Sequence, residues 1–279
     1  SEDLKNQGLK FPKAEQPKAL FYELNDYESE VFDKTINMLA NQISYARYMP
    51  MTYYQGDDLN ESLLVGQRNL GKFMKILLVK RLESSFYAFK KSIDRFLDIH
   101  DSFIDIFENR GSVYTSKGYA NKVFDLIESD NEEALEKLLE EDKVQKYQSD
   151  KFKDTFIKDL KNDKKILQSI KSLWENIDRD PKLEKFVDTL SKNKILKDNH
   201  LIIFTESKET ARYIFSKLEE IYVGKVICFD GSSSNTEKQD VINNFDANAP
   251  KKENEYRILI TTEVLAEGVE TEEELNLLN

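Results

Sequence analysis

Three apolar segments near the C-terminus each end in residues that could bind phosphate. They read "FTESKET" over 204–210, "FDGSSSN" over 229–235 and "ITTEVLAEGVE" over 260–270. Hydroxyl groups and unpaired backbone N–H groups at helix N-termini suit phosphate oxygens. The same residue types are ordinary helix caps and turn formers, so capping alone explains any one of these segments. Three of them in series favour a phosphate-binding edge.

The elements around these segments alternate between strand and helix. Apolar strands are expected at 200–205, 224–230 and 256–262, with amphipathic helices at 207–222 and 235–245. Such alternation predicts βαβ units, a parallel sheet and right-handed crossovers. In sheets of this kind, functional residues gather where the strands end. The sequence therefore predicts an α/β fold with its site at the carboxyl edge of the sheet.

The larger N-terminal part has the apolar spacing of helices. Asn25 or Asp26 can cap a first helix, and Asp180-Pro181 is a good start for a later one. A strand is possible at 19–25, before the first helix. The helices expected between these points are one long helix over about 68–108, shorter helices over 118–128 and 131–141, and another long helix over 150–178.

The pattern divides the chain into four expected parts. Long helices of this kind with few glycines and prolines indicate an all-helical region of long helices rather than a sheet. The parts are a linker at 1–26, the helical region at 27–180, an α/β part at 181–270 and a tail at 271–279.

Composition limits the possible classes of protein. The 279 residues carry a net charge of −11 and a single cysteine, Cys228, which excludes an intrachain disulfide framework and a multi-cysteine zinc site. With no secretory or membrane-spanning run, we expect a soluble cytoplasmic protein with no membrane partner, and nothing implies an oligomer. The acidic balance argues weakly against a protein coated in nucleic acid, but it does not exclude a local basic groove. The basic excess over 68–95 makes Lys80 and Arg81 candidate nucleic-acid contacts, against the alternative of a solvated helix face.

Three stretches resemble motifs of superfamily 2 helicases. "ILITTEVLAEGVE" resembles motif V, "LIIFTESKETARYIFSKLEE" resembles motif IV, and "FDGSSSNTEKQDVINNF" resembles the segment between them. Their order and spacing match a second RecA-like lobe. Two further stretches, "FPKAEQPKALFYELNDYESEVFDKTI" and "QRNLGKFMKILLVKRLESSFYAFKKSIDRF", are similar to Swi/Snf-like and RapA-like bacterial relatives, in which a helical insertion separates two lobes. The resemblance implies a truncated RecA-like lobe with a large helical insertion.

The resemblance also assigns roles to residues. It implies phosphate contacts at the strand ends and an approach to the nucleotide ribose by the loop after motif V. Glu270 departs from the pattern, which leads us to expect Asn there, and Glu267 is expected to orient the loop. The expected nucleic-acid contacts are Thr205, Ser207, Gly231, Ser232, Thr261 and Thr262, and the expected nucleotide contacts are Glu267, Gly268 and Glu270.

The sequence lacks the motifs that hydrolyse ATP. It has no Gly-x-x-x-x-Gly-Lys-Ser/Thr loop, no Asp-Glu-x-His and no Gln-Arg-x-Gly-Arg after motif V. The resemblance therefore implies an inactive fragment of an ATP-dependent helicase or translocase. The full-length parent would use ATP and Mg²⁺, double-stranded DNA as the foremost nucleic-acid partner, and a first RecA-like lobe.

Two other classes of protein are alternatives to a helicase lobe. The helices could form a protein-interaction module beside a passive α/β scaffold. A Rossmann-type enzyme is disfavoured because no Gly-x-Gly-x-x-Gly turn follows a strand.

Overall fold

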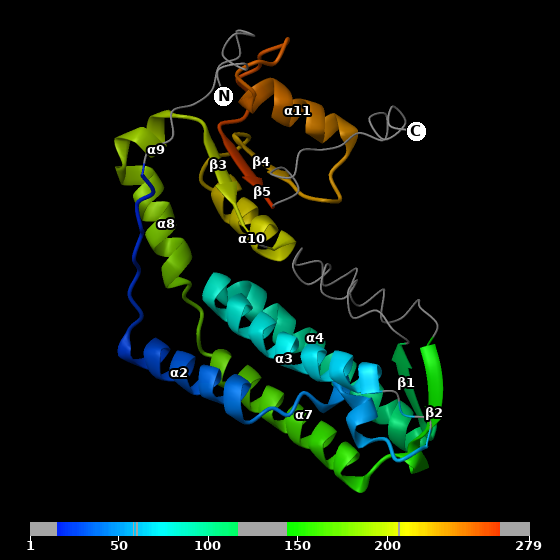
Figure 1. The fold of residues 1–279 in the computed structure, drawn as a ribbon. Coiled ribbons are helices and arrows are strands. Elements are labelled where there is room, and N and C mark those ends of the chain that lie inside the picture. The colour runs from blue at the N-terminus through cyan, green and yellow to red at the C-terminus, as the bar shows by residue number, and fades with distance from the viewer. Residues whose placement is uncertain (1–15, 58, 60, 117–143, 206, 263–279) are drawn as a thin grey trace, which may run out of the picture. The chain divides into compact units, whose positions relative to one another are not determined.

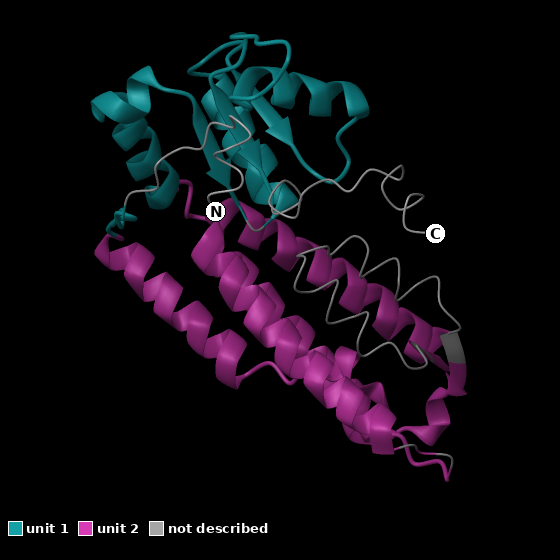
Figure 2. Cartoon of the chain, turned by 45° about the horizontal axis from the view of Figure 1, so that its top comes forward, with its two compact units in different colours: residues 1–23, 181–279 teal, residues 24–180 magenta. Residues whose placement is uncertain are grey.

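The computed structural model describes residues 16–57, 59, 61–116, 144–205 and 207–262. The chain divides into two compact units (Figure 2). Unit 1 comprises residues 1–23 and 181–279, and unit 2 comprises residues 24–180. Each unit has its own apolar core among the described residues, so each is considered by itself.

Unit 2 is built mainly from helices (Figure 1). The first begins at Asp26 because Asn25 and Glu28 form a reciprocal capping box. The elements in chain order are α2 (Asp26–Asn41), η1 (Ala46–Tyr48), η2 (Pro50–Tyr53), α3 (Glu61–Ser84), α4 (Phe86–Asn109), β1 (Ser112–Ser116), β2 (Val144–Gln148), η3 (Ser149–Lys151) and α7 (Asp154–Trp174).

The single long helix expected over 68–108 is wrong, because the helix breaks at Ser85. This residue is extended (φ −157°, ψ 128°), and its side chain accepts a hydrogen bond from the Ala88 N–H. The break lets α3 and α4 pack side by side (Figure 1). The apolar spacing runs through the break undisturbed, so only the capping preference of serine marks it in the sequence.

The expected all-helical character of this region also needs correction. β1 and β2 form an antiparallel pair, in which Ser112 lies opposite Gln148 and Ser116 opposite Val144. The helices expected over 118–128 and 131–141 lie outside the described residues. The strand expected at 19–25 is wrong, since these residues form no strand.

A buried tryptophan joins α7 to the other helices of unit 2. Trp174 is 2% exposed and meets Phe86 and Phe89 edge-on, with ring centroids 4.7 and 5.3 Å away. Its indole N–H donates to the Thr35 hydroxyl at 2.8 Å, so this buried polar group has a hydrogen-bond partner. Trp174 is the only tryptophan in the chain, so its fluorescence reports on unit 2 alone.

A buried carboxylate on α7 fixes the turn after α2. Asp163 is fully buried and accepts from the Ser44 N–H at 2.7 Å, the Ser44 hydroxyl at 2.8 Å and the Ala46 N–H at 3.0 Å. Tyr45, between these partners, has a φ of 57°, a conformation that non-glycine residues seldom adopt. Burial raises the pKa of the Asp163 carboxyl, and the hydrogen bonds from Ser44 and Ala46 oppose that rise. The carboxylate therefore holds a strained backbone by pairing the N–H groups on either side of it.

The ends of unit 2 are tied by an ion pair. Glu28, on the first turn of α2, is 3% exposed and accepts from the Asn25 N–H at 2.9 Å. Its carboxylate also accepts a hydrogen bond from Arg179, with 3.2 Å between Nη1 and Oε1. The residues that open and close this unit therefore lie together.

Unit 1 is an α/β unit. Its helices and strands occur at the residues expected from the sequence, with one additional short helix, α9. They are α8 (Pro181–Lys192), α9 (Lys194–Asp198), β3 (Leu201–Phe204), α10 (Lys208–Glu219), β4 (Val226–Phe229), α11 (Asn235–Phe245) and β5 (Ile258–Thr261).

The three strands form a parallel sheet in the order β3-β5-β4. β5 is buried along its whole length and lies between the other two. One face packs with α8 and α10 through residues such as Leu190 and Leu218, and the other packs with α11 through Val241. The predicted α/β class with a parallel sheet is confirmed. Within the described part of the chain, no helix combines the length and apolar character that crossing a membrane requires.

The three hydrogen bonds of Asp163 predict a large effect of Asp163→Ala. The variant leaves the Ser44 and Ala46 N–H groups without the carboxylate, which should lower the free energy of unfolding of unit 2 by roughly 3 kcal/mol. Urea unfolding followed by Trp174 fluorescence measures this loss. The control is Asp98→Ala, which removes an exposed carboxylate from α4. Equal losses in the two variants would contradict the role given to Asp163.

His100 predicts a pH dependence of the same unfolding transition. The imidazole, on α4, is 2% exposed, and its Nδ1–H donates to the Phe96 carbonyl at 2.7 Å. Burial, aided by the charge of Arg47, lowers the pKa of His100 to about 4. The unfolded chain takes up a proton near pH 6.5 while the folded chain does not, so stability should fall as the pH drops from about 6.5 towards 4.

The size of this effect can be measured by difference. Between pH 7 and pH 4, the free energy of unfolding should fall by about 3 kcal/mol less in His100→Gln than in the original chain. The free energy of unfolding, followed by Trp174 fluorescence at several pH values, gives the two profiles. Parallel profiles for the variant and the original chain would show that His100 titrates normally in the folded state.

Candidate nucleic-acid interface

Three residues form a row across the carboxyl edge of the sheet in unit 1. Phe204, Thr261 and Phe229 are paired across β3, β5 and β4 as the last residues of those strands. The residues that come directly after β3, β5 and β4 are Thr205, Thr262 and Asp230, respectively, and these three residues form the row. The backbone bond from the Thr205 N–H to the Thr261 carbonyl, 2.9 Å long, continues the pairing past the end of β3. Thr262 therefore occupies the middle position of the row.

The row lies on the α10 face of the sheet. Side chains alternate between the two faces of a strand, so Thr205 lies on the same face as Ile203, and Thr262 lies on the same face as Ile260. Both isoleucines belong to the core on the face packed by α8 and α10. This placement brings the strand ends and the first turns of α10 to one rim of unit 1.

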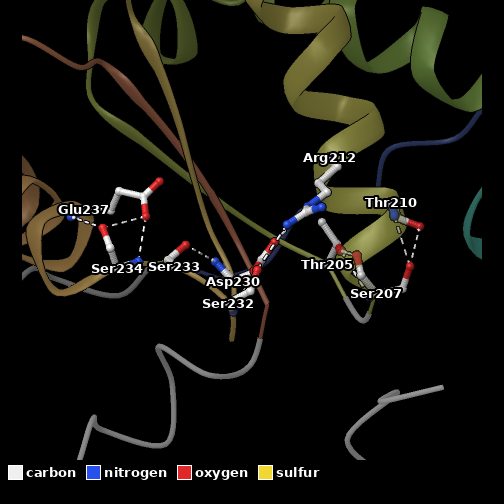
Figure 3. Close-up of polar contacts among 9 residues, drawn as sticks. All are labelled: Thr205, Ser207, Thr210, Arg212, Asp230, Ser232, Ser233, Ser234 and Glu237. Atoms are coloured by element: carbon white, nitrogen blue, oxygen red, sulfur yellow. Dashed lines mark hydrogen bonds and ion pairs between the residues drawn. The ribbon is translucent and has the colours of Figure 1, made fainter. Parts of the chain in front are cut away.

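Thr205 is half-buried and uses its hydroxyl within the turn. The hydroxyl donates to the Ser207 carbonyl at 2.7 Å and accepts from the Ser207 N–H at 3.1 Å (Figure 3). The hydroxyl proton is therefore committed to the turn in this structure.

Ser207 is the N-cap of α10 and is 2% exposed. Its hydroxyl accepts from the Thr210 N–H and donates to the Thr210 hydroxyl, each at 3.0 Å (Figure 3). The capping alternative therefore accounts for Ser207, and its location does not favour contact with a phosphate.

Asp230 is the centre of a network after β4. It is 4% exposed, and its Oδ1 accepts from the Ser232 N–H at 2.8 Å and from the Ser232 hydroxyl at 2.5 Å. Its Oδ2 accepts from Arg212 Nε at 3.1 Å. Arg212 also donates from Nη2 to the Ser232 hydroxyl at 3.1 Å, which closes a ring of hydrogen bonds between α10 and the turn after β4 (Figure 3).

The network sets the ionisation of Asp230. Burial acts to raise the pKa of its carboxyl, but the hydrogen bonds from Ser232 and the contact with Arg212 outweigh burial and lower it. Asp230 is therefore a carboxylate at neutral pH, held by the donors around it.

The first turn of α11 is closed by its own capping box. The Ser234 hydroxyl accepts from the Glu237 N–H at 3.2 Å, and the Glu237 carboxylate accepts from the Ser234 N–H at 2.6 Å (Figure 3). The hydrogen bonds that the Ser234 N–H and hydroxyl donate to the carboxylate lower the pKa of Glu237. The serines of "FDGSSSN" are thus used in part for local structure.

The other expected contacts of the rim differ in their exposure. Gly231 and Ser232 are exposed, and Thr262 is 9% exposed. Thr261 is fully buried in β5, and its hydroxyl donates to the Thr262 carbonyl at 3.2 Å. Its burial leaves Thr261 no surface with which to contact a ligand in this structure.

The remaining expected residues lie elsewhere. Lys80 is exposed on α3, whereas its neighbour Arg81 is 4% exposed, a burial that does not favour nucleic-acid contact. Both belong to unit 2, so the structure does not place them relative to the rim of unit 1. Glu267, Gly268 and Glu270 lie outside the described residues.

Asp230 and Arg212 were not among the expected site residues. The signal for Asp230 was present in the sequence, because it follows its strand by the same one position as Thr205 and Thr262 follow theirs. Arg212 gave no such signal, since its role depends on the packing of α10 beside β4.

The described residues offer no evident metal centre. They contain no group of three or more His, Cys, Asp or Glu side chains arranged to hold an ion. Cys228 is half-buried on β4, and burial raises the pKa of its thiol to about 11, so the thiol stays protonated at neutral pH.

Solved structures with some likeness to the chain are remote. The Hef helicase domain of Pyrococcus furiosus is 16% identical with a TM-score of 0.37, and the match covers 90% of this chain and 47% of that one. The C-terminal part of the Fun30 ATPase domain is 16% identical with a TM-score of 0.34, covering 89% of this chain and 69% of that one. The chain thus spans about half the length of the Hef helicase domain. TM-scores this low do not indicate a shared arrangement of the whole chain.

The sequence comparison is more specific. No curated protein matches the chain. Residues 181–274 match the family model of the helicase conserved C-terminal domain. This segment contains every described element of unit 1 and the complete row of Thr205, Thr262 and Asp230. The resemblance of this segment to a helicase C-terminal lobe, predicted from the motifs at its strand ends, is therefore confirmed.

Proposed function

We propose that the chain is the second lobe of an ATP-dependent translocase or helicase and contacts the backbone of nucleic acid, with double-stranded DNA as the foremost substrate. The observation that carries the proposal is the row Thr205–Thr262–Asp230, three neighbouring strand ends on one rim of a unit matched by the helicase C-terminal family. A row of this kind follows the direction across the strands, with successive positions about 4.8 Å apart.

The available donors of the rim suit a sugar–phosphate backbone. Gly231 is exposed, and its N–H has no hydrogen-bond partner among the described residues. Over the same part of the chain, the Thr262 hydroxyl likewise has none. Backbone N–H groups and hydroxyls contact phosphates without reading bases. The rim is therefore suited to contacts that do not depend on sequence.

The chain's own residues do not form an ATP site of the P-loop kind. The sequence lacks the phosphate loop whose lysine and backbone bind ATP phosphates, so ATP and Mg²⁺ would be bound by a parent protein that supplies a first lobe. The role left to unit 1 is to hold the backbone. Closure of the two lobes would then shift the held strand.

A titration against salt separates this proposal from the interaction-module alternative. Binding of the chain to a fluorescein-labelled duplex should weaken as salt rises, with a negative slope of log affinity against log salt and no dependence on base sequence. Fluorescence anisotropy at several salt concentrations measures the slope. No binding to the duplex, beside a stable complex with a protein partner, would favour the interaction module instead.

Thr262→Val should weaken binding without changing the salt slope. The variant keeps the shape of the side chain and removes a neutral donor, so about a three- to tenfold loss of affinity is expected. A neutral group releases no counterion, so the slope should stay the same. The matched control is Thr189→Val on α8, whose hydroxyl donates to the Lys185 carbonyl. Unchanged affinity in Thr262→Val would remove this contact from the proposal.

Ser207→Ala should lower the stability of unit 1 without weakening binding to the duplex. The loss of the N-cap of α10 should cost about 1 kcal/mol of stability in unit 1. Affinity for the duplex should stay within twofold, because the buried hydroxyl is used by Thr210. Thermal unfolding by circular dichroism and the anisotropy titration measure the two quantities. A loss of affinity with unchanged stability would return Ser207 to the set of contacts.

A further inference from the structure

Arg212 is the most exposed charged group of the network at the rim. Its side chain is 60% exposed, whereas that of its partner Asp230 is 4% exposed. A guanidinium has five N–H donors in a planar fork. Two are used, one on Asp230 and one on Ser232. The others, including both on Nη1, have no partner among the described residues.

Ser232 is poorly suited to donate to a phosphate. A hydroxyl has a single proton, and that of Ser232 is donated to Asp230 Oδ1 at 2.5 Å. Its oxygen accepts from Arg212 Nη2 at the same time. Ser232 therefore links the arginine to the carboxylate, and Arg212 is the charged donor of this network.

Asp230 fixes the direction of the guanidinium. Bonds at Nε and Nη2 hold one edge of the fork, so the plane of the group cannot rotate freely. The opposite edge, at Nη1, is the one left for an anion. A phosphate oxygen there would lie within about 3 Å of the positive group and farther from the carboxylate.

We infer that Arg212 contacts a backbone phosphate and that Asp230 is the positioning residue that orients it. This rests on the proposed function and names the group through which the rim attracts the polynucleotide. The contact is charge-assisted, and fixing the side chain before binding reduces the entropy lost on binding.

Asp230→Asn gives a test in which two accounts predict opposite signs. If only net charge matters, removing a negative charge beside the rim strengthens binding to a polyanion. If Asp230 orients Arg212, the amide holds the fork less well and binding weakens. We expect a loss of affinity for the labelled duplex of about threefold or more.

Arg212→Gln tests the contact itself. The loss of a charged donor to phosphate should weaken binding about tenfold or more. It should also make the salt slope less steep by about 0.9, the value for one phosphate of B-form DNA. Arg212→Lys keeps the charge but cannot form the fork, so it should retain more of the slope than Arg212→Gln while still losing affinity.

The control is Lys217→Gln, which removes the same charge from the same helix. Lys217 pairs with Glu220 at 3.2 Å in the last turn of α10.

The double variant Arg212→Gln, Asp230→Asn tests whether the two residues act together. Asp230→Asn should add no further loss of affinity once Arg212 is replaced by Gln, because Asp230 acts through the arginine. Circular dichroism melting checks that each variant is folded, and if Asp230→Asn is not folded, the two Arg212 variants decide the outcome.

The outcomes separate this inference from the proposed function. Binding by the original chain that Arg212→Gln weakens no more than Lys217→Gln overturns the inference and leaves the proposed function standing. Equal or tighter binding by folded Asp230→Asn overturns the positioning role. If the original chain does not bind the duplex, the proposed function fails, and the inference fails with it.

Discussion

The candidate site depends on one constraint, the pairing of three parallel strands around a fully buried central strand. β5 lies between β3 and β4, and every residue of it is buried. Parallel pairing in this register makes the strands end together, so Thr205, Thr262 and Asp230 form a row although more than fifty residues separate the first from the second. A slip of one residue in any strand would turn its end to the opposite face and destroy the row.

Within unit 1, much of the polar chemistry at the rim serves to fix the rim. Thr205 and Ser207 hold the turn into α10, and Ser234 with Glu237 caps α11. The bridge between these two turns is the ring of Arg212, Asp230 and Ser232, which joins helix to strand end. Side chains whose donors and acceptors already have partners give the surface its shape and leave other groups, such as backbone N–H and guanidinium donors, to face a ligand.

Unit 2 uses the same means for a different purpose. Asp163 pairs the backbone on both sides of the left-handed Tyr45, and Glu28 with Arg179 ties its first helix to its last residues. These contacts bridge segments more than a hundred residues apart in the chain, so they add to the apolar packing that joins the helices of unit 2. Residues 24–180 lie outside the family match.

The sequence by itself determined the elements of unit 1. Short apolar runs alternating with amphipathic helices predict a parallel sheet, and the residue that follows each strand is visible by counting. The strand order β3-β5-β4 came from the structure. The start of α2 was predicted to within one residue, at Asn25 or Asp26, and that of α8 at Asp180-Pro181, because capping and proline placement act within one turn of helix.

Only the tertiary structure decided which of these side chains face outward. Nothing local distinguishes the fully buried Thr261 from Thr262, which is 9% exposed, or the buried Arg81 from the exposed Lys80. The break at Ser85 and the pairing of β1 with β2 also depend on what the segments pack against. The partnership of Arg212 with Asp230 is long-range, so no pattern in the sequence could announce it. Local sequence fixes secondary structure through short-range hydrogen bonds and apolar spacing, whereas burial and partner choice follow from contacts between segments far apart in the chain.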